Sequence, residues 1–322
     1  MAVVRILSLL KQIFRCTFPT LVIVCLIACG SLENSDLPSD AEEEDLGDRT
    51  KVTEINFADA ALEKCIQQYS VTYAFELQTL ACNQKGIVNI SGLEHFTELV
   101  HLELDDNSIE DISPISGLKK LTALYLNNNH ITDIGPVSEL VNVINLDLNQ
   151  NEIEDISFLI KLKNISYLGL FRNNIVDISS LAGLTKMISV NIGDNNIVDV
   201  SPLEGLPELN YLYLSHNSIN RVAPLRTLTN LVFLALDNNE ITSACYLDTL
   251  TELIGLHLHG NDVQDEVSCL GTLTKIMNVN DLQINLEGNF SLHCAELDEL
   301  EASYPIPGTG EECYVLRPAT CL

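Results

Sequence analysis

Asparagine recurs with a fixed 22-residue period through the middle of this chain, and this spacing constrains the fold more strongly than any other feature. The eight positions are Asn107, Asn129, Asn151, Asn173, Asn195, Asn217, Asn239 and Asn261. Apolar residues keep the same period, so that residues 99–118 read LxxLxLxxNxIxxIxxIxxL. A fixed period of this length indicates a solenoid, in which each repeat forms one coil and buries its apolar face against the next.

Each repeat is expected to contain one short β-strand. Leu102 and Leu104 alternate with polar residues, and one such strand per coil gives a parallel sheet with strands about 4.8 Å apart. The asparagine follows where the chain turns inward. Its amide can donate and accept hydrogen bonds. We therefore predict that it satisfies backbone groups of its own coil and the next, which would each cost about 1–3 kcal/mol if buried unpaired.

This pattern resembles the leucine-rich repeat, and its 22-residue length is similar to that of the bacterial internalins. The resemblance covers residues 55–294. It implies an α/β solenoid, a curved right-handed horseshoe with a parallel sheet on its concave face and short helices or turns on its convex face. We expect an N-terminal cap with a degenerate coil over residues 51–98, regular repeats over residues 99–281, and a terminal coil with a C-terminal cap over residues 282–322.

The first residues read as a targeting signal. Three basic residues precede an apolar run at residues 21–28 that is too short to span a bilayer. The run continues into the sequence LIAC at residues 26–29, which resembles the bacterial lipobox. The resemblance implies a signal peptide over residues 1–28 and a lipid on Cys29, and Gly30 in place of Asp favours the outer membrane. The alternative is an ordinary secretory signal with a chance cysteine.

The chain is strongly acidic, with a formal net charge of −28. Residues 1–28 carry three basic residues and no acid, so their removal would lower the charge to −31. This charge opposes binding to nucleic acid and to anionic lipid headgroups, and we exclude both as ligands. Residues 29–50 contain few large apolar groups and are predicted to form an acidic tether behind the lipidated cysteine.

The N-terminal cap is predicted to contain a short amphipathic helix. Asp59 is a suitable N-cap residue, and the apolar residues that follow it share one helical face. A degenerate coil comes next, and we interpret Asn83, a 24-residue step before Asn107, as its ladder asparagine. Cys65 and Cys82 flank the junction between the helix and this coil, so we predict a disulfide bond between them.

The other cysteines after Cys29 also indicate an oxidising compartment, because they lie in the caps or in the last, irregular coils. Cys245 and Cys269 occupy nearly equivalent positions of adjacent coils and are predicted to pair. The sequence around residues 286–294 is similar to the cysteine cap of plant-type extracellular leucine-rich repeat proteins. One of Cys294, Cys313 and Cys321 must remain unpaired, and the sequence does not identify it.

Two groups of residues are candidates for metal binding. His257 and His259 point to one face of a strand, beside Asp237 of the neighbouring coil. We interpret them as polar members of a binding surface, with a metal as the alternative. A second ladder is formed by Asp111, Asp133, Asp155, Asp177 and Asp199. Turn chemistry explains this ladder more simply than calcium does, because each Asp can accept from nearby backbone amides. We expect no metal, no cofactor and no catalytic site.

The outward strand positions are free of any role in folding. In the first three coils they carry mainly acidic and amide residues. Aromatic residues occupy them from the fourth coil onward, and the partner-binding candidates are Tyr167, Phe171, Tyr211, Tyr213, Phe233, His257 and His259. Large aromatic side chains on an otherwise polar face are typical of binding surfaces.

These features predict an envelope-anchored recognition scaffold that is not an enzyme. The resemblance implies that a monomer at the bacterial cell surface or outer membrane binds an unidentified protein ligand through the concave face. Binding of a glycan or the cell wall, or a structural role in the envelope, are the alternatives.

We predict that Cys29→Ser releases the protein from membranes, because acylation would be its membrane link. Fractionation followed by immunoblotting measures this. The serine variant should appear in the soluble fraction, and its recovery with the membranes after signal cleavage would contradict the lipobox interpretation.

Overall fold

The computed structural model describes residues 49–264, 267–273 and 284–286. All of these belong to one compact unit, residues 45–322. The predicted signal peptide, Cys29 and nearly all of the tether lie outside the described residues. The same holds for Cys294, Cys313 and Cys321, and for residues 282–322 apart from residues 284–286.

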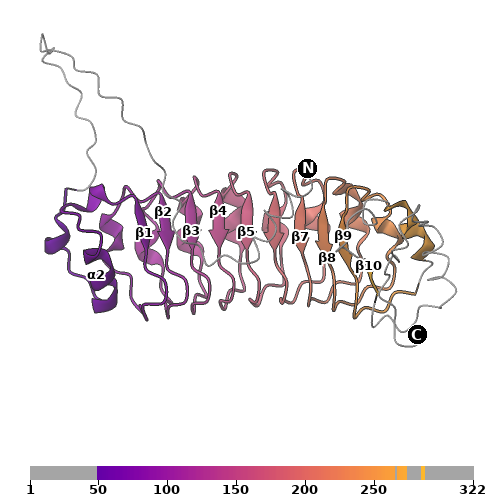
Figure 1. Cartoon of the computed structure of the whole chain (residues 1–322), viewed down its shortest axis with the longest axis horizontal. Helices are drawn as coiled ribbons and strands as arrows, with labels where there is room; N and C mark the ends of the chain where they lie inside the picture. The colour runs from indigo at the N-terminus through magenta and orange to yellow at the C-terminus, as the bar shows by residue number, and fades with distance from the viewer. Residues whose placement is uncertain (1–48, 265–266, 274–283, 287–322) are drawn as a thin grey trace, which may run out of the picture. The chain divides into compact units, whose positions relative to one another are not determined.

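The described chain forms a solenoid with one parallel sheet of ten strands, which lie in chain order and one beside the next (Figure 1). The strands are β1 (Thr79–Ala81), β2 (His101–Glu103), β3 (Ala123–Tyr125), β4 (Asn145–Asp147), β5 (Tyr167–Gly169), β6 (Ser189–Asn191), β7 (Tyr211–Tyr213), β8 (Phe233–Ala235), β9 (Gly255–His257) and β10 (Ile284–Asn285). From β1 to β9, successive strands pair with a constant 22-residue offset. The predicted leucine-rich repeat solenoid is confirmed.

Short 3-10 helices form the side of the solenoid opposite the sheet. They are η3 (Leu93–His95), η4 (Ser113–Ile115), η5 (Gly135–Glu139), η6 (Ser157–Lys161), η7 (Ser179–Leu181), η8 (Ser201–Leu203), η9 (Ala223–Thr227), η10 (Cys245–Leu247) and η11 (Val267–Thr272). Proline occupies the start of η4, η5, η8 and η9, where its fixed φ and missing N–H cost nothing. Small, tight turns of this kind let each coil return to the sheet within one repeat.

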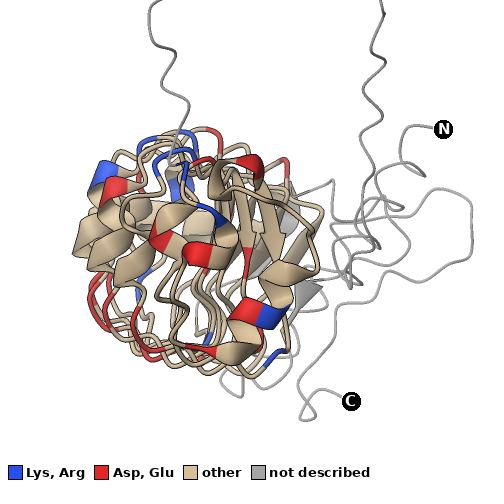
Figure 2. Cartoon of the chain, turned by 90° about the vertical axis from the view of Figure 1, so that its left-hand side faces the viewer, with Lys and Arg blue, Asp and Glu red and all other residues tan. Residues whose placement is uncertain are grey.

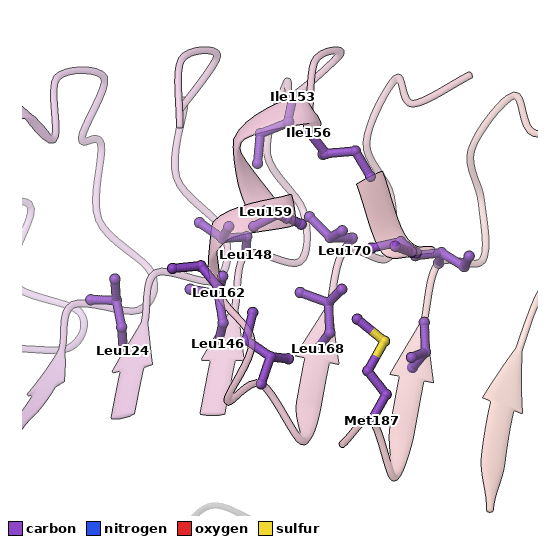
Figure 3. Close-up of a cluster of buried hydrophobic side chains, with 14 of the residues drawn as sticks. Leu124, Leu146, Leu148, Ile153, Ile156, Leu159, Leu162, Leu168, Leu170 and Met187 are labelled. Atoms are coloured by element: carbon purple, nitrogen blue, oxygen red, sulfur yellow. The ribbon is translucent and has the colours of Figure 1, made fainter. Parts of the chain in front are cut away.

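The core lies between the sheet and the 3-10 helices. Leu146 and Leu148 reach it from one coil and Leu168 and Leu170 from the next, and Leu159 meets them from η6 (Figure 3). All are at most 3% exposed. Because each side chain packs against its equivalents in neighbouring coils, the core is continuous along the stack.

Each ladder asparagine holds two coils together through its side-chain amide. Asn173 Nδ2 donates to the carbonyl oxygens of Leu170 in its own coil (3.1 Å) and Leu148 in the coil before (3.0 Å). Its Oδ1 accepts from the backbone N–H of Ile153, also in the coil before (3.0 Å). The bonds are of the expected kind, but the second coil is the preceding one, whereas we expected the following one.

The turn before each ladder asparagine needs a left-handed backbone. The residue at this position has φ near +55° in coil after coil: Asp106, Asn128, Gln150, Arg172, Asp194, His216 and Asn238, with Gly260 at +66° in the last. Positive φ is unfavourable for a residue with a Cβ. The buried amide that follows is positioned to stabilise this turn, since it donates to the carbonyl group three residues earlier, just before the turn.

The interpretation of Asn83 as a ladder residue is wrong. β1 and β2 pair Ala81 with Glu103, so Asn83 lies in register with Asp105, before the ladder position. Its Oδ1 accepts from Asp105 N at 2.8 Å. Lys85 occupies the ladder position of this first coil, and its N–H donates to the Asn107 Oδ1.

A helix closes the N-terminal end of the core, after the short turn η1 (Val52–Glu54) and before η2 (Ala74–Glu76). This helix, α2 (Ala60–Gln67), buries Leu62 and Ile66, and Asp59 Oδ1 caps it by accepting from the N–H of Ala61 at 2.8 Å. The other carboxylate oxygen of Asp59 accepts from Val88 N in the first coil. The cap is therefore tied to the repeats as well as packed on them.

Disulfide bonds join both pairs of cysteines expected from the sequence within the described chain. Cys65 of α2 is bonded to Cys82, which follows β1, with 6.0 Å between the Cα atoms. Cys245 of η10 is bonded to Cys269 of η11, with 5.5 Å between the Cα atoms. Each bond connects neighbouring segments near one end of the stack. In the described part of the chain, no helix has the length and apolar character required to cross a membrane.

We predict that Asn173→Ala lowers the free energy of unfolding by at least about 1 kcal/mol, because it leaves backbone groups of two coils buried without partners. Urea denaturation measures this. Asn174→Ala is the matched control, since Asn174 is exposed and adjacent. Equal midpoints for Asn173→Ala and the wild type would remove the role assigned to the ladder.

Candidate binding surface

The outward side chains of the strands form three rows across the sheet, and we call this surface the sheet face. The first row contains the residues in register with His101, the second those in register with Glu103, and the third those in register with Asp105, just beyond the strands. The strand geometry alone sets these rows, because alternate residues of a strand point to opposite faces. Their chemistry is therefore free to vary from coil to coil.

One continuous aromatic patch covers β7 to β9, and we call Tyr211, Tyr213, Phe233, His257 and His259 the aromatic cluster. The Tyr213 and Phe233 ring centroids are 5.3 Å apart, and those of Phe233 and His257 are 5.1 Å apart. Tyr211 lies directly beside Phe233 in the sheet register. All five side chains are partly exposed, so the cluster is a surface and not part of the core.

Tyr167 and Phe171 do not join this cluster, although the sequence analysis grouped them with it. The coil of β6 separates them, and its outward residues Ser189 and Gly193 are small. Tyr167 is 49% exposed. The Arg172 guanidinium lies 5.1 Å from the centre of the Phe171 ring, which is the geometry of a cation–π contact. Tyr167 and Phe171 form a separate outward pair in the coil of β5.

His257, His259 and Asp237 lie together as expected, but at distances unlike those of a metal site. The His259 Nε2 and His257 Nδ1 atoms are 3.7 Å and 4.0 Å from the carboxylate of Asp237. Ser215 Oγ donates to Asp237 Oδ1 at 2.7 Å. Burial lowers the pKa of His257, although the nearby charge of Asp237 acts in the opposite direction. The lowered pKa favours a neutral imidazole. Among the residues described, no three His, Cys, Asp or Glu side chains are arranged to hold a metal ion.

Carboxylates gather at the other end of the sheet face, and we call Glu103, Asp105 and Asp147 the acidic cluster. Burial, with a smaller effect of the nearby charges of Asp147 and Glu103, raises the pKa of Asp105 to about 7, against a hydrogen bond from Asn127 N. Burial also raises the pKa of Asp147. A hydrogen bond with His101 instead lowers the pKa of Glu103. Asp and Glu are also marked along other edges of the coils in Figure 2.

Turn chemistry explains the aspartate ladder formed by Asp111, Asp133, Asp155, Asp177 and Asp199. In each coil the carboxylate accepts from the backbone N–H two residues later, as Asp155 does from Ser157 at 2.8 Å and Asp133 from Gly135 at 2.7 Å. These hydrogen bonds lower the pKa of Asp155 and Asp199, which favours their charged forms. The bonds start the 3-10 helices, so the ladder has a structural role in every coil where it occurs.

Two features of the sheet face were not singled out from the sequence. The His101 and Tyr125 rings lie 5.4 Å apart beside the acidic cluster, and burial raises the pKa of Tyr125. Gly169 lies beside Asp147, and a Cβ there would lie 2.8 Å from the Asp147 Oδ1. The repeat register could have identified both, because it places residues 125, 147 and 169 in one row.

Comparisons with known proteins agree with this geometry. The family model described as leucine-rich repeats in two copies matches residues 97–139 and 119–161. A search of curated proteins finds no match. Among solved structures, the chain is similar to an internalin, InlF, from Listeria monocytogenes, with 30% identity and a TM-score of 0.63, covering 79% of this chain and 82% of that one. Internalin C2 of the same organism matches with 30% identity and a TM-score of 0.55, covering 70% and 94%.

A more distant neighbour is the ectodomain of the plant receptor kinase GASSHO1/SCHENGEN3 from Arabidopsis thaliana, in complex with CASPARIAN STRIP INTEGRITY FACTOR 2. It has 24% identity and a TM-score of 0.55, and the match covers 62% of this chain and 25% of that one. At this identity it shows the fold alone. Fold and matches together define a bacterial leucine-rich repeat protein. Within that class, the chain belongs to the internalin family.

We predict that Asp105→Asn stabilises the protein at pH 8 and has little effect below pH 4. The folded-state pKa, about 7, is above the ordinary value of 3.8, so between these values the folded state binds more protons than the unfolded state. The free energy of unfolding therefore falls as the pH rises through this window. The side chain of the Asp105→Asn variant does not ionise, so the variant avoids this loss of stability.

Chemical denaturation at both pH values tests this prediction. Asp105 is only partly buried, so we expect a gain of roughly 1 kcal/mol at pH 8, well below the full linkage value. Glu154→Gln, an exposed carboxylate away from the sheet face, is the control. A destabilised Asp105→Asn at pH 8 would contradict the assigned pKa.

Proposed function

We propose that this protein is a recognition scaffold whose sheet face binds a protein partner, anchored by Tyr211, Tyr213 and Phe233. The observation that carries the proposal is the aromatic cluster itself. The Tyr213, Phe233 and His257 rings are in contact, and Tyr211 lies beside Phe233 in the sheet register. All are partly exposed and free of any role in the core. Aromatic side chains bury a large area at small entropic cost and dominate interface energies.

Membership of the internalin family supports a scaffold without enzymatic activity. The plant receptor ectodomain, with the same type of fold, is in complex with CASPARIAN STRIP INTEGRITY FACTOR 2, which supports the use of such solenoids for recognition. We further propose that the protein acts as a monomer at the bacterial cell surface or outer membrane, attached through a lipid on Cys29. Tyr167 and Phe171 would then serve as a secondary contact on the same face.

The tyrosine pair provides the test. We predict that Tyr211→Ala with Tyr213→Ala weakens binding to an identified partner by about 2 kcal/mol or more, roughly the threshold for an interface hot spot. The melting temperature should change little, because neither side chain is in the core. Surface plasmon resonance and differential scanning calorimetry measure the two effects.

Phe158→Ala with Tyr246→Ala is the matched control. Both side chains are exposed, at 37% and 48%, and both belong to 3-10 helices on the side opposite the sheet. Full binding by the tyrosine variant, or loss of binding by the control variant, would place the site elsewhere. A glycan array probed with the same proteins tests the carbohydrate alternative, which predicts glycan signals that depend on the same tyrosines.

A further inference from the structure

Building on the proposed function, we infer that the partner presents an extended segment that crosses the strands of the sheet face. Its basic side chains lie over Glu103, Asp105 and Asp147, and its apolar side chains lie over the aromatic cluster. The inference rests on charge complementarity and on the spacing of the two clusters.

Asp105 and Asp147 lack a cation of their own, whereas Glu103 is paired with His101. Within the described part of the chain, no Lys or Arg forms an ion pair with Asp105 or Asp147. The basic residues that do form ion pairs use other acids: Lys51 pairs with Glu54, Lys120 with Glu98, Lys161 with Glu139 and Arg172 with Asp194. Partly buried carboxylates without a cation are costly, and a lysine or arginine from a partner would remove much of that cost.

Hydrogen bonds hold the carboxylates of the acidic cluster in place. Asp105 Oδ1 accepts from the backbone N–H of Asn127 at 2.8 Å, and Asp147 Oδ1 accepts from that of Asn149 at 3.0 Å. Glu103 is held by His101 and by Asn83 Nδ2. The three groups are therefore pre-positioned, which lowers the entropy lost when a partner binds.

Gly169 leaves room for the side chains of the preceding coil. Any other residue would place its Cβ 2.8 Å from Asp147 Oδ1 and 2.8 Å from Asn149 Nδ2. The coil of β6 lies between β5 and the aromatic cluster, and its outward residues are Ser189, Asn191 and Gly193. None of these carries a charge, so a ligand that contacts both clusters would cross an uncharged part of the sheet face.

The spacing of the clusters sets the spacing in the ligand. β4, which carries Asp147, and β7, which carries Tyr213, are three strands apart, or about 14 Å at about 4.8 Å per strand. An extended chain covers about 3.3–3.6 Å per residue, so about four residues fit between the basic and the apolar part.

This contact should depend on pH because Asp105 must be ionised to bind a cation. The groups that face it are Glu103 and His101 on β2, Asp106 in the turn, Tyr125 on β3, Asp147 on β4 and the neutral Asn83 after β1. The acids among them raise the pKa of Asp105, to about 7 with burial. The ionised fraction of such a group falls roughly tenfold between pH 8 and pH 6, so affinity should fall in the same direction.

Synthetic peptides test the inference. The probe, called the lysine peptide, has two lysines, a four-residue Gly-Ser spacer and two phenylalanines. The control, called the glutamate peptide, has glutamates in place of the lysines. Fluorescence anisotropy with the whole protein should give at least tenfold tighter binding of the lysine peptide than of the glutamate peptide at pH 8, and up to tenfold weaker binding of the lysine peptide at pH 6. The double variant Asp105→Asn with Asp147→Asn should bind the lysine peptide at least tenfold more weakly than the wild type does.

The matched control is Glu110→Gln with Glu154→Gln, which removes the same charge from exposed residues outside the sheet face and should change the affinity less than twofold. Equal binding of the two peptides, no measurable binding of the lysine peptide, or an unaffected aspartate variant would each overturn the inference. If the tyrosine double variant loses an identified partner while the aspartate variant keeps it, the inference fails and the proposed function stands. If both variants still bind that partner, the inference and the proposed function both fail.

Discussion

A buried asparagine amide that bridges two coils is the interaction on which the rest of this structure depends. In coil after coil it donates to a carbonyl of its own turn and a carbonyl of the coil before, and accepts an N–H from that same coil. The turn it stabilises contains a residue with positive φ, which would otherwise be unfavourable. Because the bridge recurs once in every repeat, the strands stay in register, and the outward side chains are aligned in rows.

That alignment gives the sheet face its chemistry. Residues of successive coils are brought side by side, so Tyr211 lies beside Phe233. Burial, together with the charge of Asp147 two coils away, raises the Asp105 pKa. Neither cluster is needed for folding, since the core lies on the other side of the sheet and is filled mainly by Leu, Ile and Val. We propose that the aromatic cluster and the carboxylates of Asp105 and Asp147 serve binding and contact different parts of one ligand.

The regular coils could be predicted from the sequence because one period determines both the strands and the ladder. The first coil could not: its ladder position holds Lys85, and choosing the asparagine nearest to that position selected Asn83, which the strand pairing places in register with Asp105 instead. The candidate surface was predicted in outline. Tyr167 and Phe171, however, were grouped with the aromatic cluster, although the coil of β6 lies between them and that cluster. The raised pKa of Asp105 also required the structure, because it depends on burial and on acids from several strands.

Site-specific photo-crosslinking tests the central claim, that the sheet face is the recognition surface, most directly. A benzoylphenylalanine replaces Tyr211 in one sample of residues 51–322 and Phe158, on the opposite side, in another. The account predicts that a partner protein crosslinks to the protein labelled at position 211 and not to that labelled at position 158. A partner that crosslinks from position 158 alone, or equally from both, would contradict the account.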